Sequence, residues 1–155
     1  DASRYLGDWY ELYRSKNIRF ERGSDITARY ASDPTHPERI AITNLQTLAN
    51  GKIDTITGYA TRRTPEGPAS DLSIRFNFFL RGKYQILRTD YETFSIVYSS
   101  RSLLFGLLKK EYCWILARKR ESRKDVELID GLFKTILDET GMTRDEFIET
   151  EFSQE

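Results

Sequence analysis

Residues 111–118, which read EYCWILAR, decide the fold. Side chains of a β-strand point alternately to opposite faces. One face of this segment carries Tyr112, Trp114, Leu116 and Arg118, and the other carries Glu111, Cys113, Ile115 and Ala117. Because both faces are largely apolar, one must be covered by another element while the other lines an interior. A sandwich without a cavity is the alternative.

The same alternation of period two runs along most of the chain, in segments rich in β-branched and aromatic residues. Turn clusters such as Asn50-Gly51 and Arg81-Gly82 separate the segments. The predicted strands are 9–14, 25–32, 39–46, 52–63, 71–79, 83–89, 93–100 and 111–119. We therefore expect an all-β fold: an eight-stranded antiparallel up-and-down barrel whose interior takes one small ligand.

Helical periodicity begins only after residue 121, in an acidic part of the chain. Ser122 and Asp125 resemble a capping box, the apolar positions between Val126 and Leu137 recur at helical spacing, and Gly141 supplies a stop. A helix over about 123–140 should pack on the outside of the barrel. The expected organisation is one domain, 1–155, with the barrel at about 9–119 and a tail at 141–155 that holds a short capped turn at Thr143.

Composition excludes several classes of function. With 24 basic and 24 acidic residues the net charge is zero, which argues against nucleic acid as a partner. Cys113 and His36 are the only residues of their types, so neither a metal site nor Cys/His catalysis is expected, and no phosphate loop occurs, so no cofactor is expected. A lone cysteine slightly favours a reducing compartment. The chain begins without Met, so a trimmed leader or a lipid anchor stays an open alternative and the localisation is unknown.

Three segments together resemble the signature regions of the lipocalin family: residues 7–10 (GDWY), residues 89–91 (TDY) and Arg118 at the end of the last strand. The similarity is greatest to the apolipoprotein D branch, which includes the bacterial outer-membrane lipocalins, and it extends from Tyr5 to about Phe147. Residues that match this branch are 5–11 (YLGDWYE), 20–23 (FERG), 89–92 (TDYE), 97–99 (VYS) and 114–118 (WILAR). Asp25 and Ser100 stand where apolipoprotein D aligns disulfide cysteines, which places secretion in doubt.

Physical chemistry gives two of these residues a structural role. A Trp on the first strand and an Arg on the last strand meet when the barrel closes, so Arg118 should stack on Trp9 and seal one end. Asp90 should accept backbone N–H bonds in a turn at the same end. We expect these residues to close the barrel and not to bind the ligand.

The lumen-facing positions follow from the inward parity of Trp9 and Arg118, extended along the other strands by the family alignment. The resulting ligand-binding set is mostly apolar and aromatic, as in a small-molecule pocket. It comprises Ala28, Tyr30, Ile42, Asn44, Ile56, Ile74, Phe76, Phe78, Tyr84, Ile86, Val97, Tyr112, Trp114 and Leu116. The same parity puts Glu11, Arg88 and Arg118 inward, as a buried ion network or with Arg88 facing a ligand carboxylate.

The expected function is binding and transport or storage of a small hydrophobic ligand of the fatty acid, lysophospholipid, sterol or retinoid type. No catalytic residue is assigned. The first alternative is an enzyme acting on a lipid-like ligand in the barrel, for which Glu11 is the single inward acid found by parity. The second is a protein-interaction module that uses the barrel exterior.

One connection is unusually apolar. Residues 101–110 carry Leu103, Leu104, Phe105, Leu107 and Leu108 between Arg101 and the pair Lys109 and Lys110. Strand counting puts this segment at the open end of the barrel. Three roles are open: peripheral docking on an anionic membrane, a lid that folds inward, and a homodimer contact.

Overall fold

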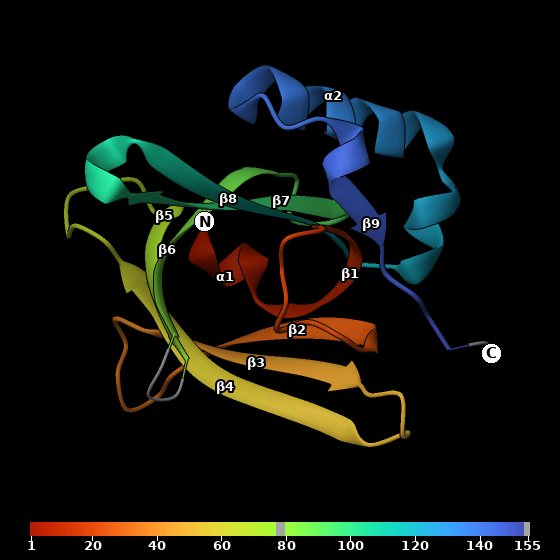
Figure 1. Ribbon diagram of the computed structural model, residues 1–155. Helices are drawn as coiled ribbons and strands as arrows, with labels where there is room; N and C mark the ends of the chain where they lie inside the picture. The colour runs from red at the N-terminus through yellow and green to blue at the C-terminus, as the bar shows by residue number, and fades with distance from the viewer. Residues whose placement is uncertain (77–79, 154–155) are drawn as a thin grey trace.

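The computed structural model describes residues 1–76 and 80–153, and within them nine antiparallel strands form one sheet (Figure 1). Strand β1 pairs with both β2 and β8, so the first eight strands close into a barrel. The short β9 pairs with the last three residues of β1. The strands are β1 Gly7–Ser15, β2 Ser24–Ser32, β3 Ile40–Thr47, β4 Ile53–Arg62, β5 Asp71–Phe76, β6 Leu80–Thr89, β7 Phe94–Leu103, β8 Leu108–Ala117 and β9 Phe147–Glu149. The predicted barrel is confirmed, with β9 as an addition that was not expected.

The main helix, α2 (Val126–Thr140), lies across the outside of the barrel, as predicted (Figure 1). It begins three residues later than expected because Asp125 is its N-cap and accepts the backbone N–H of Leu128 at 3.1 Å. Residues 120–124 form a separate 3₁₀ turn, so Ser122 is not the cap. Gly141 ends the helix with φ at 78°, a left-handed conformation that favours glycine. A capping box between Thr143 and Glu146 is confirmed, on the 3₁₀ turn Arg144–Glu146.

The two faces of β8 are buried in two different cores. Cys113, Ile115 and Ala117 pack outward under α2, in a cluster with Leu12 and Ile96 of neighbouring strands and with Ile129, Leu132, Phe133 and Ile136 of the helix. Leu116 and Trp114 point inward, in a cluster with Trp9, Tyr30, Ile42 and Val97. The double burial of this strand is therefore explained by the helix on one side and the barrel interior on the other.

Two hairpin boundaries differ from prediction. Arg81-Gly82, expected as a turn, lies inside β6, where Gly82 pairs with Ile74 of β5. The strand predicted over 71–79 ends its described part at Phe76, and residues 77–79 lie outside the described residues. Strands β7 and β8 continue through most of 101–110, where Arg101 pairs with Lys110. Only a 3₁₀ turn, Leu104–Gly106, and Leu107 remain to connect them.

Two β-bulges change which side chains face the lumen. In β6 the register shifts between Ile86 and Arg88, and the Arg88 side chain then points outward and pairs with Glu139 of α2 at 2.5 Å. The prediction that Arg88 is inward, in an ion network with Glu11 or facing a ligand, is therefore wrong. In β1 the register shifts between Glu11 and Tyr13, so Arg14 turns toward the interior beside Glu11.

Candidate ligand-binding cavity

The barrel encloses a cavity of about 840 Å³, which is in the usual size range of small-molecule sites. Its wall is mostly aliphatic and aromatic, with contributions from seven strands and from the connection that precedes β2. The lining residues are Glu11, Phe20, Glu21, Ile26, Ala28, Tyr30, Ile42, Asn44, Ile74, Phe76, Gly82, Lys83, Tyr84, Ser99, Ser100, Arg101, Tyr112, Trp114 and Leu116.

Ten of the fourteen positions predicted for the ligand site line this cavity: Ala28, Tyr30, Ile42, Asn44, Ile74, Phe76, Tyr84, Tyr112, Trp114 and Leu116. Ile56 lines a small recess of about 20 Å³, which shares Asn44 and Ile26 with the main cavity. Ile86 and Val97 belong to the inner cluster but do not line the cavity. Phe78 lies outside the described residues.

One end of the barrel is closed by Trp9 and Arg118, neither of which lines the cavity. The Arg118 guanidinium carbon lies 3.8 Å from the centroid of the Trp9 ring. Arg118 also donates hydrogen bonds to the carbonyl oxygens of Tyr91, Asp8 and Arg4 at 2.9–3.0 Å. At the same end Asp90 accepts the backbone N–H groups of residues 92–94. The guanidinium thus ties the end of β8 to the N-terminal residues 4–8 and to the turn at Tyr91.

A cluster of three tyrosines lies between this seal and the cavity, and two of them, Tyr30 and Tyr84, line the cavity. Tyr5, from the short helix α1 (Ala2–Tyr5), stacks on Trp9 and meets the edge of Tyr30, both at 5.0 Å between ring centroids. The hydroxyls of Tyr30 and Tyr84 lie 2.6 Å apart, and that of Tyr5 lies 2.8 Å from Ser95. Burial raises the pKa of all three phenols well above the usual range, so they are neutral hydrogen-bonding groups.

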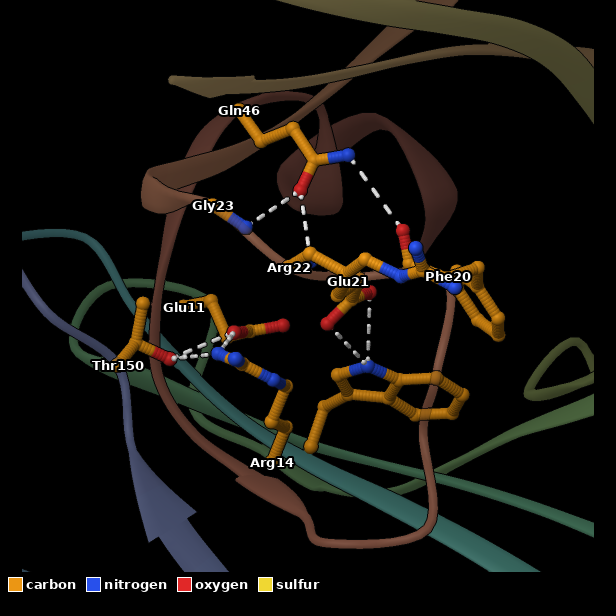
Figure 2. Close-up of polar contacts among 9 residues, drawn as sticks. Glu11, Arg14, Phe20, Glu21, Arg22, Gly23, Gln46 and Thr150 are labelled. Atoms are coloured by element: carbon orange, nitrogen blue, oxygen red, sulfur yellow. Dashed lines mark hydrogen bonds and ion pairs between the residues drawn. The ribbon is translucent and has the colours of Figure 1, made fainter. Parts of the chain in front are cut away.

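The acidic side chains of the wall, Glu11 and Glu21, come from β1 and from the connection 16–23 (Figure 2). Glu11, 2% exposed, accepts hydrogen bonds from Arg14 at 3.2 Å and from Thr150 at 2.6 Å. Glu21 accepts the indole N–H of Trp114 at 3.1 Å. Both carboxyl groups line the cavity, whereas Arg14, 8% exposed, does not.

Burial raises the pKa of Glu21 well above its usual range, and the neighbouring carboxylate of Glu11 raises it further. The hydrogen bond from Trp114 and the charge of Arg14 act in the opposite direction and do not cancel this effect. Sequence parity found Glu11 but missed Glu21, because Glu21 lies in a connection where alternation has no meaning. The match of residues 20–23 to the family was the available signal.

The connection that carries Glu21 is held in place by Gln46 of β3 (Figure 2). The Gln46 side-chain oxygen accepts the backbone N–H groups of Arg22 at 3.0 Å and Gly23 at 2.9 Å. A Cβ atom on Gly23 would lie 2.4 Å from the carbonyl oxygen of Thr47, so this close approach requires glycine. Phe20 is thereby fixed at the wall of the cavity with 45% of its surface exposed.

The open end lies opposite Trp9, because β1 runs from Gly7 at the seal toward Ser15. Lys83 and Arg101 line the cavity on β6 and β7. The turn between β7 and β8 also lies at this end, and its side chains Leu104, Phe105, Leu107 and Leu108 are exposed. Leu103 is half-buried. The side chains of this turn do not line the cavity, so the structure gives no support to the hypothesis that residues 101–110 form a lid that folds inward.

No group of three or more His, Cys, Asp or Glu side chains is arranged to hold a metal ion in residues 1–76 and 80–153. Over the same residues, no helix has the length and apolar character needed to cross a bilayer.

Comparison with known proteins identifies the family of this barrel. The family model of a lipocalin-like domain matches residues 1–149. The chain belongs to the lipocalin family. Apolipoprotein D of Bos taurus is 34% identical over 119 residues, and that of Macaca fascicularis is 35% identical over 121 residues, which places this lipocalin in the apolipoprotein D branch. The alignments cover 76% and 77% of this chain but only 60% and 61% of those relatives.

Solved structures show the same fold at lower identity. Insecticyanin from the tobacco hornworm Manduca sexta superimposes with a TM-score of 0.80 at 20% identity, over 99% of this lipocalin and 82% of that chain. Lobster apocrustacyanin A1 superimposes with a TM-score of 0.78 at 21% identity, over 98% of this lipocalin and 79% of that chain. The temperature-induced lipocalin-1 of Arabidopsis thaliana is 29% identical over 134 residues, 81% of this chain and 66% of that relative.

Proposed function

We propose that this lipocalin binds and carries a small hydrophobic ligand in its barrel. The observation that supports this most strongly is the cavity of about 840 Å³ with its aliphatic and aromatic wall. An apolar chain that leaves water for such a wall gains about 0.8 kcal/mol per methylene. A chain of about a dozen carbons then gains about 10 kcal/mol, which exceeds the lower part of the estimated cost of association, on the order of 4–15 kcal/mol. Candidate ligands are fatty acids, lysophospholipids, sterols and retinoids.

The residues that line the cavity fit a ligand carrier better than an enzyme. The two carboxyl groups that line the cavity, Glu11 and Glu21, do have different environments, as an acid and base pair needs. However, Glu11 is bound by Arg14 and Thr150, and Glu21 by Trp114, so each has a structural partner. An enzyme acting on a lipid-like ligand is therefore the second candidate, and conversion of a bound ligand into a product would distinguish it.

The exposed turn at the open end suggests where the ligand is exchanged. Phe105 is fully exposed and Leu107 is 84% exposed, while Lys109 and Lys110 follow them on β8. Apolar side chains next to cations suit the headgroup boundary of an anionic membrane. We propose that this turn docks the open end on such a surface, and a homodimer through 101–110 is the competing use of the same side chains.

The test of the proposed function is to identify what the native protein holds. The lipocalin purified from its natural source is extracted with organic solvent, and the extract is analysed by mass spectrometry beside native mass spectrometry of the intact protein. We expect one small apolar molecule per chain, recovered unchanged. A partner protein in place of a small molecule would favour the interaction module, and a ligand and its product together would favour the enzyme.

A further inference from the structure

Strands β6 and β7 separate near the open end of the barrel. Their antiparallel register ends at the pair Gln85 and Tyr98. Both strands continue beyond this pair, β6 against β5 as far as Leu80 and β7 against β8 as far as Leu103. Along these stretches each strand is therefore paired on one side only, and the two remaining backbone edges face each other without a ladder.

The cavity extends into the space between these two strands. If the same register continued, residues 82–84 of β6 would face residues 99–101 of β7. All six residues line the cavity: Gly82, Lys83, Tyr84, Ser99, Ser100 and Arg101. In an intact ladder only alternate side chains face the lumen, because neighbours along a strand point to opposite faces. Lining by three consecutive residues of each strand thus indicates an opening in the side of the barrel wall.

This opening is accessible to solvent and contains free space. Gly82, Lys83 and Arg101 are exposed. Gly82 pairs with Ile74 of the inner cluster, so a side chain at position 82 would point into the barrel, and an added Cβ would meet nothing within 4 Å. The Ser99 hydroxyl donates to the carbonyl oxygen of Lys83 at 2.6 Å. A side chain therefore links the two strands where the backbone ladder has ended.

Two cationic side chains flank the opening, one from each strand. Lys83 and Arg101 both line the cavity, and neither forms an ion pair within residues 1–76 and 80–153. Lys110 pairs with Arg101 in the register of β7 and β8, so a third cation lies on the same face. The acidic side chains of the wall, Glu11 and Glu21, have other partners. Like charges directly opposite each other on a sheet are unfavourable, so this arrangement gains from an anion placed beside it.

We propose that this opening holds the phosphate group of a single-chain lipid between Lys83 and Arg101, with the alkyl chain in the apolar lumen. The inference rests on the proposed function and names the ligand class for the same cavity. A phosphate monoester carries a charge of about −1.5 to −2 at pH 7 and has three strong acceptor oxygens, which suits donors that approach from two strands. The guanidinium can bind two of these oxygens at once, and the ammonium binds as a point charge.

The apolar lumen continues directly from the opening. Tyr84 lines the cavity, and its ring centroid lies 6.2 Å from that of Trp114 in the wall. Tyr112, which pairs with Ser99, lines the cavity as well. Aromatic surface thus connects the cationic opening with the lumen. A charged entrance that leads to an apolar interior matches an amphiphile with one chain.

The experiment compares dodecyl phosphate with dodecanol, which shares its alkyl chain, and with inorganic phosphate, which has no chain. Binding to the full chain is measured by isothermal titration calorimetry at neutral pH and low salt, because salt screens exposed charges. The variant K83Q/R101Q removes both cations, whereas G82L keeps them and fills the free space in the opening. R62Q/K124Q makes the same change of charge at two exposed residues that do not line the cavity. Circular dichroism and the thermal midpoint establish that each variant is folded.

In the wild type we expect dodecyl phosphate to bind about tenfold more tightly than dodecanol, because two exposed ion pairs together contribute about this factor. K83Q/R101Q and G82L should each abolish this preference, and R62Q/K124Q should leave it unchanged. Inorganic phosphate should bind at least about a hundredfold more weakly than dodecyl phosphate, because it lacks the chain.

Equal affinity of the wild type for dodecyl phosphate and dodecanol, or a preference that survives in K83Q/R101Q, would overturn the inference and leave the hydrophobic carrier intact. A preference that survives in G82L, or that is lost in R62Q/K124Q, would show general electrostatic attraction in place of a bound headgroup and would also overturn it. So would inorganic phosphate that binds as tightly as dodecyl phosphate, because the anion site would then have no link to the lumen. Failure of the wild type to bind either dodecyl compound would contradict the proposed function itself.

Discussion

Arg118 lies over Trp9, with the guanidinium carbon 3.8 Å from the ring centroid, and the two residues are 109 positions apart in the sequence. The same guanidinium donates to the carbonyl oxygens of Arg4, Asp8 and Tyr91. Planar stacking and a fork of N–H donors are properties of arginine that lysine lacks. The sealed end is thus fixed by one side chain that touches no part of the cavity.

Replacement of Arg118 should therefore cost stability and leave ligand selectivity alone. We expect Arg118→Ala to lower the free energy of unfolding by about 1–3 kcal/mol, since both packing and hydrogen bonds are lost. Arg118→Lys should recover only part of this loss. Urea denaturation measures the change. Unchanged stability together with lost ligand binding would show that Arg118 belongs to the ligand site.

The close approach at Gly23 gives a second prediction. Gly23→Ala places a methyl group 2.4 Å from the Thr47 carbonyl oxygen, so the connection 16–23 must shift. The expected cost is about 1–3 kcal/mol, with weaker ligand binding because Phe20 and Glu21 move with the connection. Gly131→Ala in α2 is the matched control, since nothing lies within 4 Å of its added Cβ. That control should stabilise the helix by about 0.5–1 kcal/mol, and equal effects of the two changes would refute the packing argument.

Cys113 should be unreactive in the folded protein. It is fully buried under α2, and burial raises its thiol pKa to about 12. Thiol-disulfide reagents should label it at neutral pH only when the protein unfolds, so labelling should follow the urea unfolding curve. The unfolded thiol ionises near pH 8.5 while the folded one does not, so this group stabilises the fold fully below about pH 8.5 and loses that contribution between there and about 12. Rapid labelling of the native protein would show that α2 opens readily.

The proposal that the exposed turn between β7 and β8 docks on membranes can be tested with lipid vesicles. Binding of the wild type to liposomes should increase with their content of anionic lipid, and the double variant Leu104→Asp/Phe105→Asp should reduce it severalfold. Val126→Asp/Leu137→Asp changes two exposed apolar residues of α2 and should have little effect. Normal vesicle binding by the folded turn variant would reject membrane docking. A dimer that dissociates in the same variant would support the competing role.

The sequence was sufficient for the barrel and for most of the cavity wall because alternation is a local property. Trp114 and Cys113 face opposite sides wherever the strand runs without interruption. Alternation failed at Arg88, because an extra residue in β6 reverses the faces and no sequence signal marked that bulge.

The positions of the buried charged side chains beside the cavity depend on contacts between residues that are distant in the sequence. Arg14 reaches Glu11 only because of the bulge in β1, and Thr150 joins them from the end of the chain. Glu21 reaches the lumen because Gln46 holds its connection against β3. None of these relationships follows from strand periodicity, so they required the three-dimensional structure.

The central claim, that an apolar ligand lies in the lumen against Trp114, is tested most directly by a fluorescence titration with retinol. Trp114 lines the cavity, whereas Trp9 is fully buried in the seal and has no part in the cavity wall. We expect strong, saturable quenching with one retinol per chain in the wild type and much weaker quenching in Trp114→Phe. Equal quenching of both proteins, or quenching that never saturates, would contradict a ligand site in the barrel.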